Sequence, residues 1–205
     1  LALSGVLERD GWRAVYVALA VLTAGAMLPL SLSLRRRLPL IAAHAADARA
    51  EAAVRAAAMS PRMLAWLLAL AGFACCMAMA MPQVHIVALC VDLGFGPAVG
   101  AEMLSLMLLG GVVSRILSGL AADRWGGAAV LLVGSSLQCM ALALYLPFDT
   151  MTPLYAVSLI FGLAQGGIVP CYAVIVREYL PARDAGARVG FVIMATIVGM
   201  AGGGW

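Results

Sequence analysis

Long, uninterrupted apolar runs constrain the fold of this chain more than any other feature. A helix needs about 20 mostly apolar residues to cross the hydrocarbon core of a bilayer. Six segments reach that length: 14–34, 63–91, 98–122, 128–147, 152–176 and 186–205. They lack the strict alternation of apolar and polar residues that marks a membrane β-barrel. The sequence therefore predicts an all-α, polytopic membrane protein.

Composition supports a membrane protein and narrows its chemistry. The chain is 64% hydrophobic and 11% charged, whereas soluble domains are about 45–50% apolar and about 25% charged. Its five cysteines all lie in apolar segments without metal-ligand spacing, so we interpret them as buried apolar side chains. Phosphate-binding loops, catalytic triads and metal-ligand clusters are absent from the sequence. We therefore expect neither an enzyme nor a metal or cofactor site, and no nucleic-acid partner.

Proline residues mark where three of the helices begin. Proline is favoured in the first turn of a helix, behind a small or capping residue. The pairs that fit this pattern are Ser60-Pro61, Gly96-Pro97 and Thr152-Pro153.

The distribution of arginine predicts the orientation in the membrane. Eleven of the 13 basic residues fall on alternate connections between the spans, and such connections are usually cytoplasmic. They are Arg35, Arg36, Arg37, Arg49, Arg55, Arg62, Arg115, Arg124, Arg177, Arg183 and Arg188. We therefore expect residues 35–62, 122–128 and 177–185 on the cytoplasmic side of a bacterial inner membrane. This count places both ends of the chain outside, which predicts a fragment of a longer protein.

One span carries an unusual stripe of glycine and charge. Gly111, Arg115, Gly119 and Asp123 are four residues apart, so they share one face of a helix. Glycines on such a face allow another helix to approach closely. A charge at this depth is costly in lipid, so we expect Arg115 to face protein or a water-filled cavity. The helix dipole disfavours Asp123 at a C-terminal end, so its carboxylate is expected to meet another helix N-terminus or an arginine and to latch a cytoplasmic gate.

Two further spans combine proline with polar side chains. Pro82 is expected to kink and break the helix 63–91 just before Gln83 and His85, because proline removes a backbone hydrogen bond. His85 has two candidate roles, a proton-exchanging group in a cavity or a hydrogen-bonded link between helices.

In the span 152–176, Gly162-x-x-x-Gly166 predicts close packing and Pro170 predicts a bend. Gln165 and Tyr172 lie seven residues apart and are expected to share a face, either facing a ligand or bonding between helices.

The pattern Gly119-x-x-x-Asp123-Arg124-x-Gly126 resembles the signature loop of the major facilitator superfamily, in the copy that joins helices 8 and 9. Arg115, four residues before Gly119, makes it similar to the bacterial branch related to monocarboxylate transporters. Two positions depart from the pattern: Gly111 stands where those transporters often have aspartate, and the loop continues without basic residues.

Two other stretches, residues 11–13 and 180–188, resemble the entry to helix 6 and the loop between helices 10 and 11. The resemblance thus implies helices 6 to 11 of twelve. Residues 1–34 would then end the N-terminal helix bundle, 35–62 would form the central cytoplasmic loop, and 63–205 would form most of the C-terminal bundle.

The resemblance implies a secondary active transporter that works by alternating access. Its substrate would be a small organic anion such as a monocarboxylate, with protons as the coupling ion. Arg115 would either bind the substrate carboxylate through its planar fork or brace the gate. In the family, helices 7 and 10 line the central cavity, which places Gln83, His85, Gln165 and Tyr172 as candidate ligand contacts.

The alternatives are transport of a drug-like or sugar-like molecule, and a remnant without activity. The implied partners are the lipid bilayer, the substrate and the missing helices of the same protein, without which we expect this chain to be inactive.

Overall fold

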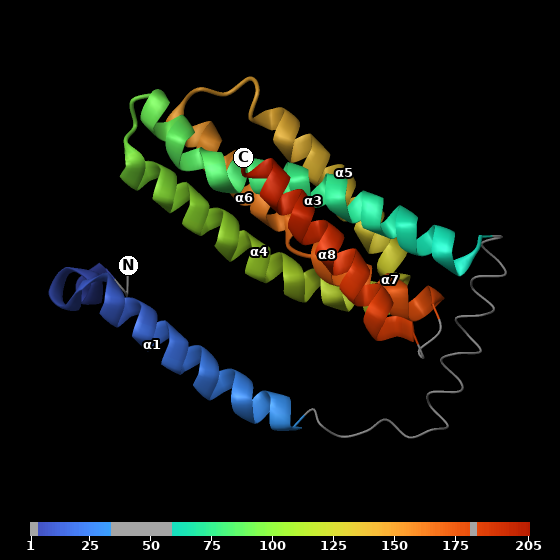
Figure 1. The fold of residues 1–205 in the computed structure, drawn as a ribbon. Helices are drawn as coiled ribbons and strands as arrows, with labels where there is room; N and C mark the ends of the chain where they lie inside the picture. Colours follow the sequence, from blue (N-terminus) through green and yellow to red (C-terminus); the bar gives the residue numbers. More distant parts are fainter. Residues whose placement is uncertain (1–3, 34–58, 181–183) are drawn as a thin grey trace. The chain divides into compact units, whose positions relative to one another are not determined.

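The computed structural model describes residues 4–33, 59–180 and 184–205, and the regular structure in these ranges is helical (Figure 1). The helices are α1 (Ser4–Ser33), α3 (Pro61–Asp92), α4 (Pro97–Trp125), α5 (Gly127–Leu144), α6 (Met151–Gln165), α7 (Ile168–Tyr179) and α8 (Ala185–Gly203).

Six stretches of these helices are long and apolar enough to cross a membrane: Arg13–Leu32, Pro61–Asp92, Pro97–Trp125, Gly127–Leu144, Met151–Tyr179 and Ala185–Gly203. Each matches one predicted span to within a few residues. The prediction of an all-α, polytopic membrane protein is confirmed.

The chain divides into two compact units, Leu1–Ala42 and Ala43–Trp205. The first contains α1, whose backbone leaves the helical region at Gly11 (φ 76°, ψ 173°). That positive φ suits glycine, which has no Cβ. Most of the connection predicted at 35–62 lies outside the described residues.

All three predicted prolines lie in the first turn of a helix, and one of the three expected capping residues is corrected. Ser60 caps α3, because its hydroxyl accepts a hydrogen bond from the Met63 amide at 3.2 Å. Gly96 has a φ of 84° and leads directly into Pro97, the first residue of α4. The third helix, α6, begins at Met151, so its cap is Thr150 and not Thr152.

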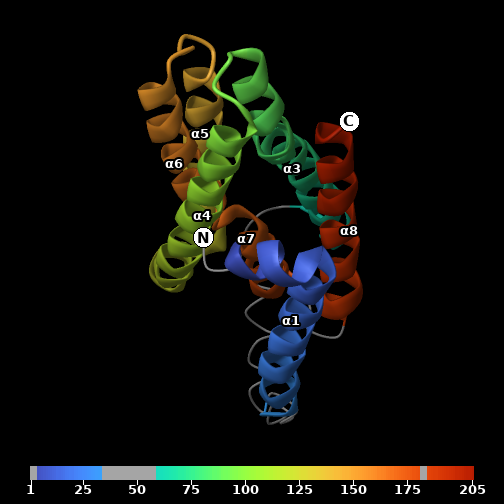
Figure 2. The same cartoon turned by 90° about the vertical axis from the view of Figure 1, so that its left-hand side faces the viewer.

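In the second unit, α3 packs mainly on α8 and α4 packs mainly on α6, while α5 lies against α6 and α7 (Figure 2). Successive spans run in opposite directions. One end of this unit therefore holds the start of α3, the α4–α5 turn, the end of α7 and the start of α8. We call it the arginine-bearing end, because it carries Arg62, Arg124, Arg177 and Arg188. The side of the membrane that it faces stays a prediction.

Two buried clusters hold the second unit together. One joins α3, α7 and α8 around Cys76, Tyr172 and Val192. The other joins α3, α4 and α6 around Met107 and Phe161. Many large apolar side chains outside these clusters are exposed, as a lipid-facing surface requires.

The two proline predictions inside helices had opposite outcomes. The predicted span 152–176 is interrupted at Gly166 and Gly167, between α6 and α7. Pro170 explains the interruption, because it has no N–H to bond to the Gly166 carbonyl. In contrast, α3 is continuous through Pro82, so the predicted break there is wrong, and the kink stays a prediction. Membrane helices tolerate such a proline when neighbouring groups compensate for the lost hydrogen bond.

Candidate functional site

A small cavity lies where α3, α4 and the α6–α7 interruption meet. Its volume is about 170 Å³. The lining residues are Met79, Gln83, Leu108, Gly111, Val112, Arg115, Gln165, Gly166 and Val169. The cavity thus brings together three residues that the sequence predicted separately on three different spans: Gln83, Arg115 and Gln165.

The two glutamines form a direct bridge across the cavity wall. Gln83 Nε2 of α3 donates a hydrogen bond of 2.8 Å to Gln165 Oε1 of α6. Gln165 is almost fully buried, with 4% of its surface exposed. Each amide carries both donors and acceptors, so the bridge leaves Gln165 Nε2 and Gln83 Oε1 able to bond a further polar group. The pair is uncharged and polar, and its hydrogen bond fixes the direction of both amides.

Arg115 lies at the rim of this cavity and is exposed. The helix α4 continues to Trp125, so Arg115 is ten residues from its end, which is about 15 Å along the axis. The whole of α4 has 29 residues, or about 43 Å, so a hydrocarbon core of about 30 Å centred on it would place Arg115 about 9 Å inside the core. Within the described ranges, Arg115 has no carboxylate partner. A charge so deep needs water or an anionic ligand.

Close glycine packing brings the end of α6 against α4. A Cβ on Gly162 would overlap the Met107 carbonyl, and one on Gly166 would overlap the Gly111 carbonyl. The close packing predicted for Gly162-x-x-x-Gly166 is therefore confirmed, and so is the close approach predicted at Gly111. Gln165 is adjacent to Gly166 in the chain, so this contact places Gln165 in the wall of the cavity that Arg115 also lines.

The structure does not bring His85 or Tyr172 to this cavity. His85 is exposed and lies two residues after Gln83, which is about 200° around a helix of 3.6 residues per turn. Tyr172 is 1% exposed. It lines a different cavity, of about 400 Å³, together with Cys75 and Leu131. Gln165 and Tyr172 therefore line two different cavities, and whether they share a face stays a prediction.

The predicted gate residues lie at the arginine-bearing end of α4. Gly119, Asp123 and Arg124 are exposed, and a Cβ on Gly119 would meet nothing within 4 Å among the described residues. Gly126 makes the turn into α5 with a φ of 83°. The helix N-terminus or arginine expected to bind Asp123 is not found among the described residues.

Glu178 provides the carboxylate-to-helix contact that the sequence argument assigned to Asp123. Its Oε1 and Oε2 accept hydrogen bonds from the Gly127 amide, at 3.4 and 3.3 Å. Gly127 is the first residue of α5, where a carboxylate is favoured by the helix dipole. Glu178 is also an acidic residue near a helix C-terminus, so the reasoning applied to Asp123 would have selected it too.

Arg188 is a second residue that sequence reasoning left without a role. Its Nη1 donates to the Pro61 carbonyl at 3.1 Å, and its Nη2 donates to Asp184 at 3.4 Å. These bonds join the starts of α8 and α3. Within the described part of the chain, no group of three His, Cys, Asp or Glu side chains is placed to hold a metal ion.

Six helices are long and apolar enough to cross a membrane, and a cavity lined in part by Gln83, Arg115 and Gln165 lies between three of the helices. These features define a multi-pass membrane protein. The family model of the Major Facilitator Superfamily matches residues 1–204. The chain belongs to this superfamily, whose members are membrane transporters and not enzymes.

Curated relatives match part of the chain at low identity. Monocarboxylate transporter 13 of Bos taurus is 30% identical over 121 residues, which are 58% of this chain and 28% of that protein. Monocarboxylate transporter 13 of Rattus norvegicus is 29% identical over 121 residues, which are again 58% of this chain and 28% of that protein. Probable anion transporter 7 of Oryza sativa subsp. japonica is 31% identical over 113 residues, 54% of this chain and 26% of that protein. The matches thus span less than a third of the relatives' length. No solved structure matches the chain significantly.

Proposed function

We propose that this chain is part of a secondary active transporter of small organic anions, and that the cavity at Arg115 is part of its substrate site. The observation that carries the proposal is an arginine within a membrane-spanning helix, at the rim of a cavity that also holds two glutamine side chains. This arginine has no carboxylate partner among the described residues. A guanidinium binds a carboxylate through two parallel hydrogen bonds. The names of the relatives, monocarboxylate and anion transporters, agree with this substrate class.

The geometry favours the substrate role of Arg115 over the gate role. Arg115 and Asp123 are eight residues apart on one helix, which is about 12 Å. That separation is too long for a direct ion pair, so Arg115 is poorly placed to brace the loop. It is well placed to meet a ligand beside the Gln83–Gln165 bridge.

Several finer features belong to the same proposal. The chain would be a fragment corresponding to helices 6 to 11 of a bacterial inner-membrane protein in the branch related to monocarboxylate transporters. Missing helices of the same protein would close the exposed side of Arg115 and complete an alternating-access cavity. Protons would be the coupling ion, with the substrate moved by symport.

A second candidate function is transport of a neutral, sugar-like or drug-like molecule. It is favoured by the amide bridge, because the free donor of Gln165 and the free acceptor of Gln83 suit hydroxyl groups as well as carboxylates.

The experiment that separates the two compares ligand affinity in the intact protein and in Arg115→Lys. Acetate and propionate are the anionic probes, and acetamide and propionamide are their neutral counterparts. Lysine keeps the charge but loses the planar fork, so we expect the affinity for the acids to fall about tenfold or more. The amides should bind weakly to both proteins.

The matched control is Arg62→Lys, because Arg62 is exposed in the first turn of α3, away from the cavity. It should leave affinity unchanged. Equal affinity for the acids in the wild type and in Arg115→Lys would contradict the anion site, and tight binding of the amides would favour the neutral substrate.

A further inference from the structure

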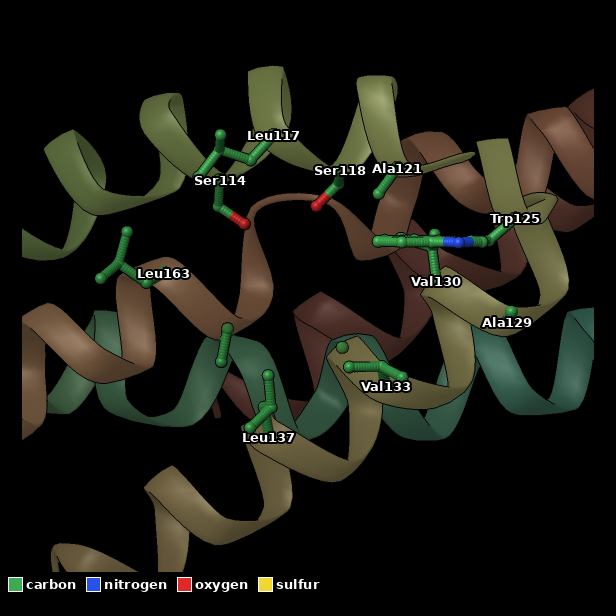
Figure 3. Close-up of a pocket in the computed structure, with 12 residues that line it drawn as sticks. Ser114, Leu117, Ser118, Ala121, Trp125, Ala129, Val130, Val133, Leu137 and Leu163 are labelled. Carbon is green, nitrogen blue, oxygen red and sulfur yellow. The ribbon is translucent and has the colours of Figure 1, made fainter. Parts of the chain in front are cut away.

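A second, larger cavity opens as a crevice between α4 and α5, and α6 forms its floor (Figure 3). Its volume is about 460 Å³. The lining is apolar apart from two serine hydroxyls and one indole, and includes Leu117, Ala121, Trp125, Val133 and Leu163. It lies on the opposite side of the α4–α6 contact from the cavity at Arg115 and shares no lining residue with it.

The crevice extends through about one leaflet of a bilayer. On α4 its lining runs from Trp125 to Ser114, eleven residues, or about 16 Å along the axis. Half of a hydrocarbon core of about 30 Å is about 15 Å. The crevice therefore starts at the arginine-bearing end of the bundle and ends near the membrane midplane.

The mouth of the crevice has the side chains of a membrane–water interface. The Trp125 indole lies across it (Figure 3), and Trp125 is 69% exposed. Tryptophan is enriched at this depth because its ring is apolar and its N–H is polar. Arg124 is adjacent in the chain and shares a helix face with Leu117 and Ala121, at spacings of seven and three residues. It is exposed, and no carboxylate among the described residues pairs with it.

The end of the crevice at which α4 and α5 meet is too narrow to admit another helix. The only residue between α4 and α5 is Gly126, so the two helices meet at the mouth. A helix with its side chains is about 10–12 Å wide, which is too wide to enter between two helices joined by one residue. A single acyl chain can enter there.

We propose that this crevice binds one anionic phospholipid from the leaflet at the arginine-bearing end. One acyl chain lies along the crevice over α6, and the phosphate lies beside Arg124. The cation supplies the preference for an anionic headgroup, because a basic residue near the membrane surface attracts anionic lipid. The indole of Trp125 packs against the glycerol region of the same lipid.

Photo-crosslinking in bilayers tests the proposal. The intact protein is reconstituted with phosphatidylglycerol or phosphatidylcholine that carries a diazirine on one acyl chain, and labelled residues are located by peptide mass spectrometry. We expect labelling on Leu117, Ala121 and Val133. It should be about fivefold stronger with phosphatidylglycerol, the preference that one basic residue near the surface provides.

Two pairs of variants make the result specific. Arg124→Gln should remove the preference for phosphatidylglycerol, whereas Arg62→Gln, at the same end of the bundle, should keep it. Ala129→Phe should fill the crevice and reduce its labelling. Ala128→Phe is the matched control, because Ala128 lines the neighbouring cavity at Tyr172.

Equal crevice labelling by the two lipids would overturn the proposal, and so would a preference that survives Arg124→Gln or is lost equally in Arg62→Gln. Absence of label from the crevice would also overturn it, because another segment of the protein would then cover the site.

Discussion

Two helix pairs in this molecule, α4 with α6 and α3 with α8, pack through the same kind of glycine contact. They differ in the side chains that surround that contact. In the α4–α6 pair, Gly162 and Gly166 lie against the carbonyls of Met107 and Gly111. In the α3–α8 pair, Gly199 and Gly203 lie against the carbonyls of Phe73 and Met77. In each pair, two glycines four residues apart on one helix pack against two carbonyls four residues apart on the other helix.

The surroundings of the two contacts are different. The α4–α6 contact leads to Arg115, the amide bridge and the helix interruption. The groove beside the α3–α8 contact is lined by apolar side chains and one indole, that of Trp66. There, Trp66 and Phe191 meet edge to face with ring centroids 4.9 Å apart. Close glycine packing is therefore a structural device shared by both contacts, and the polar side chains beside one of them mark the candidate site.

The largest effect should come from adding one methyl group to the glycines of the two contacts. Gly166→Ala and Gly203→Ala would each force a Cβ into a carbonyl, so each should lower stability by about 1–3 kcal/mol. Only Gly166→Ala should also weaken binding of propionate, about tenfold or more, because it moves Gln165 away from Arg115. Thermal unfolding and ligand titration in the same bilayers would separate the two effects.

Gly119→Ala is the matched control, since a Cβ there would meet nothing among the described residues. It should leave both stability and binding unchanged. A loss of binding in Gly203→Ala as large as in Gly166→Ala would break the comparison.

A similar effect on stability should come from the buried glutamines. Gln165→Leu leaves Gln83 without its partner, and an unsatisfied polar group costs about 1–3 kcal/mol. Gln138 offers a comparison, because it is also buried but donates to the Cys75 carbonyl at 3.0 Å, away from the cavity.

Gln138→Leu should therefore lower stability without changing the affinity for propionate, whereas Gln165→Leu should lower both. Affinity that is unchanged in Gln165→Leu would remove the amide bridge from the site.

The smallest effect should come from the cap on α5. Glu178→Gln keeps the shape of the side chain and removes its charge from the helix N-terminus, so we expect a loss of about 0.5–1 kcal/mol in stability. Asp123→Asn, which has no such contact among the described residues, should cost less. Thermal unfolding of both variants measures this, and a larger loss in Asp123→Asn would show that Asp123 has a partner elsewhere in the intact protein.

Sequence reasoning succeeded where local chemistry decides the structure. Apolar length predicted all six spans, Ser60-Pro61 predicted a cap, and Gly162-x-x-x-Gly166 predicted close packing. It failed at Pro82 because the cost of a proline depends on the neighbouring helices, which the local sequence does not reveal. The contact between Gln83 and Gln165 was equally hidden, since it depends on how three helices pack.

The choice between similar residues also required the structure. His85 and Gln83 both follow Pro82, but helical rotation turns only Gln83 toward the cavity. Asp123 and Glu178 both lie near helix C-termini, and among the described residues only Glu178 has a partner at a helix start. In both cases the sequence predicted the right type of residue, but the direction of each side chain in the fold determined which residue makes the contact.

Protection of a single cysteine by substrate tests the central claim most directly. In a background without native cysteines, Val112→Cys places a thiol in the cavity at Arg115, and Val198→Cys places one in the groove of the α3–α8 pair. The two valines are similarly exposed, at 57% and 55%. Propionate should slow maleimide modification of the Val112→Cys protein and leave the Val198→Cys protein unchanged, while propionamide should protect neither. Equal modification rates with and without propionate at position 112, or equal protection at both positions, would contradict a substrate site on the α4–α6 contact.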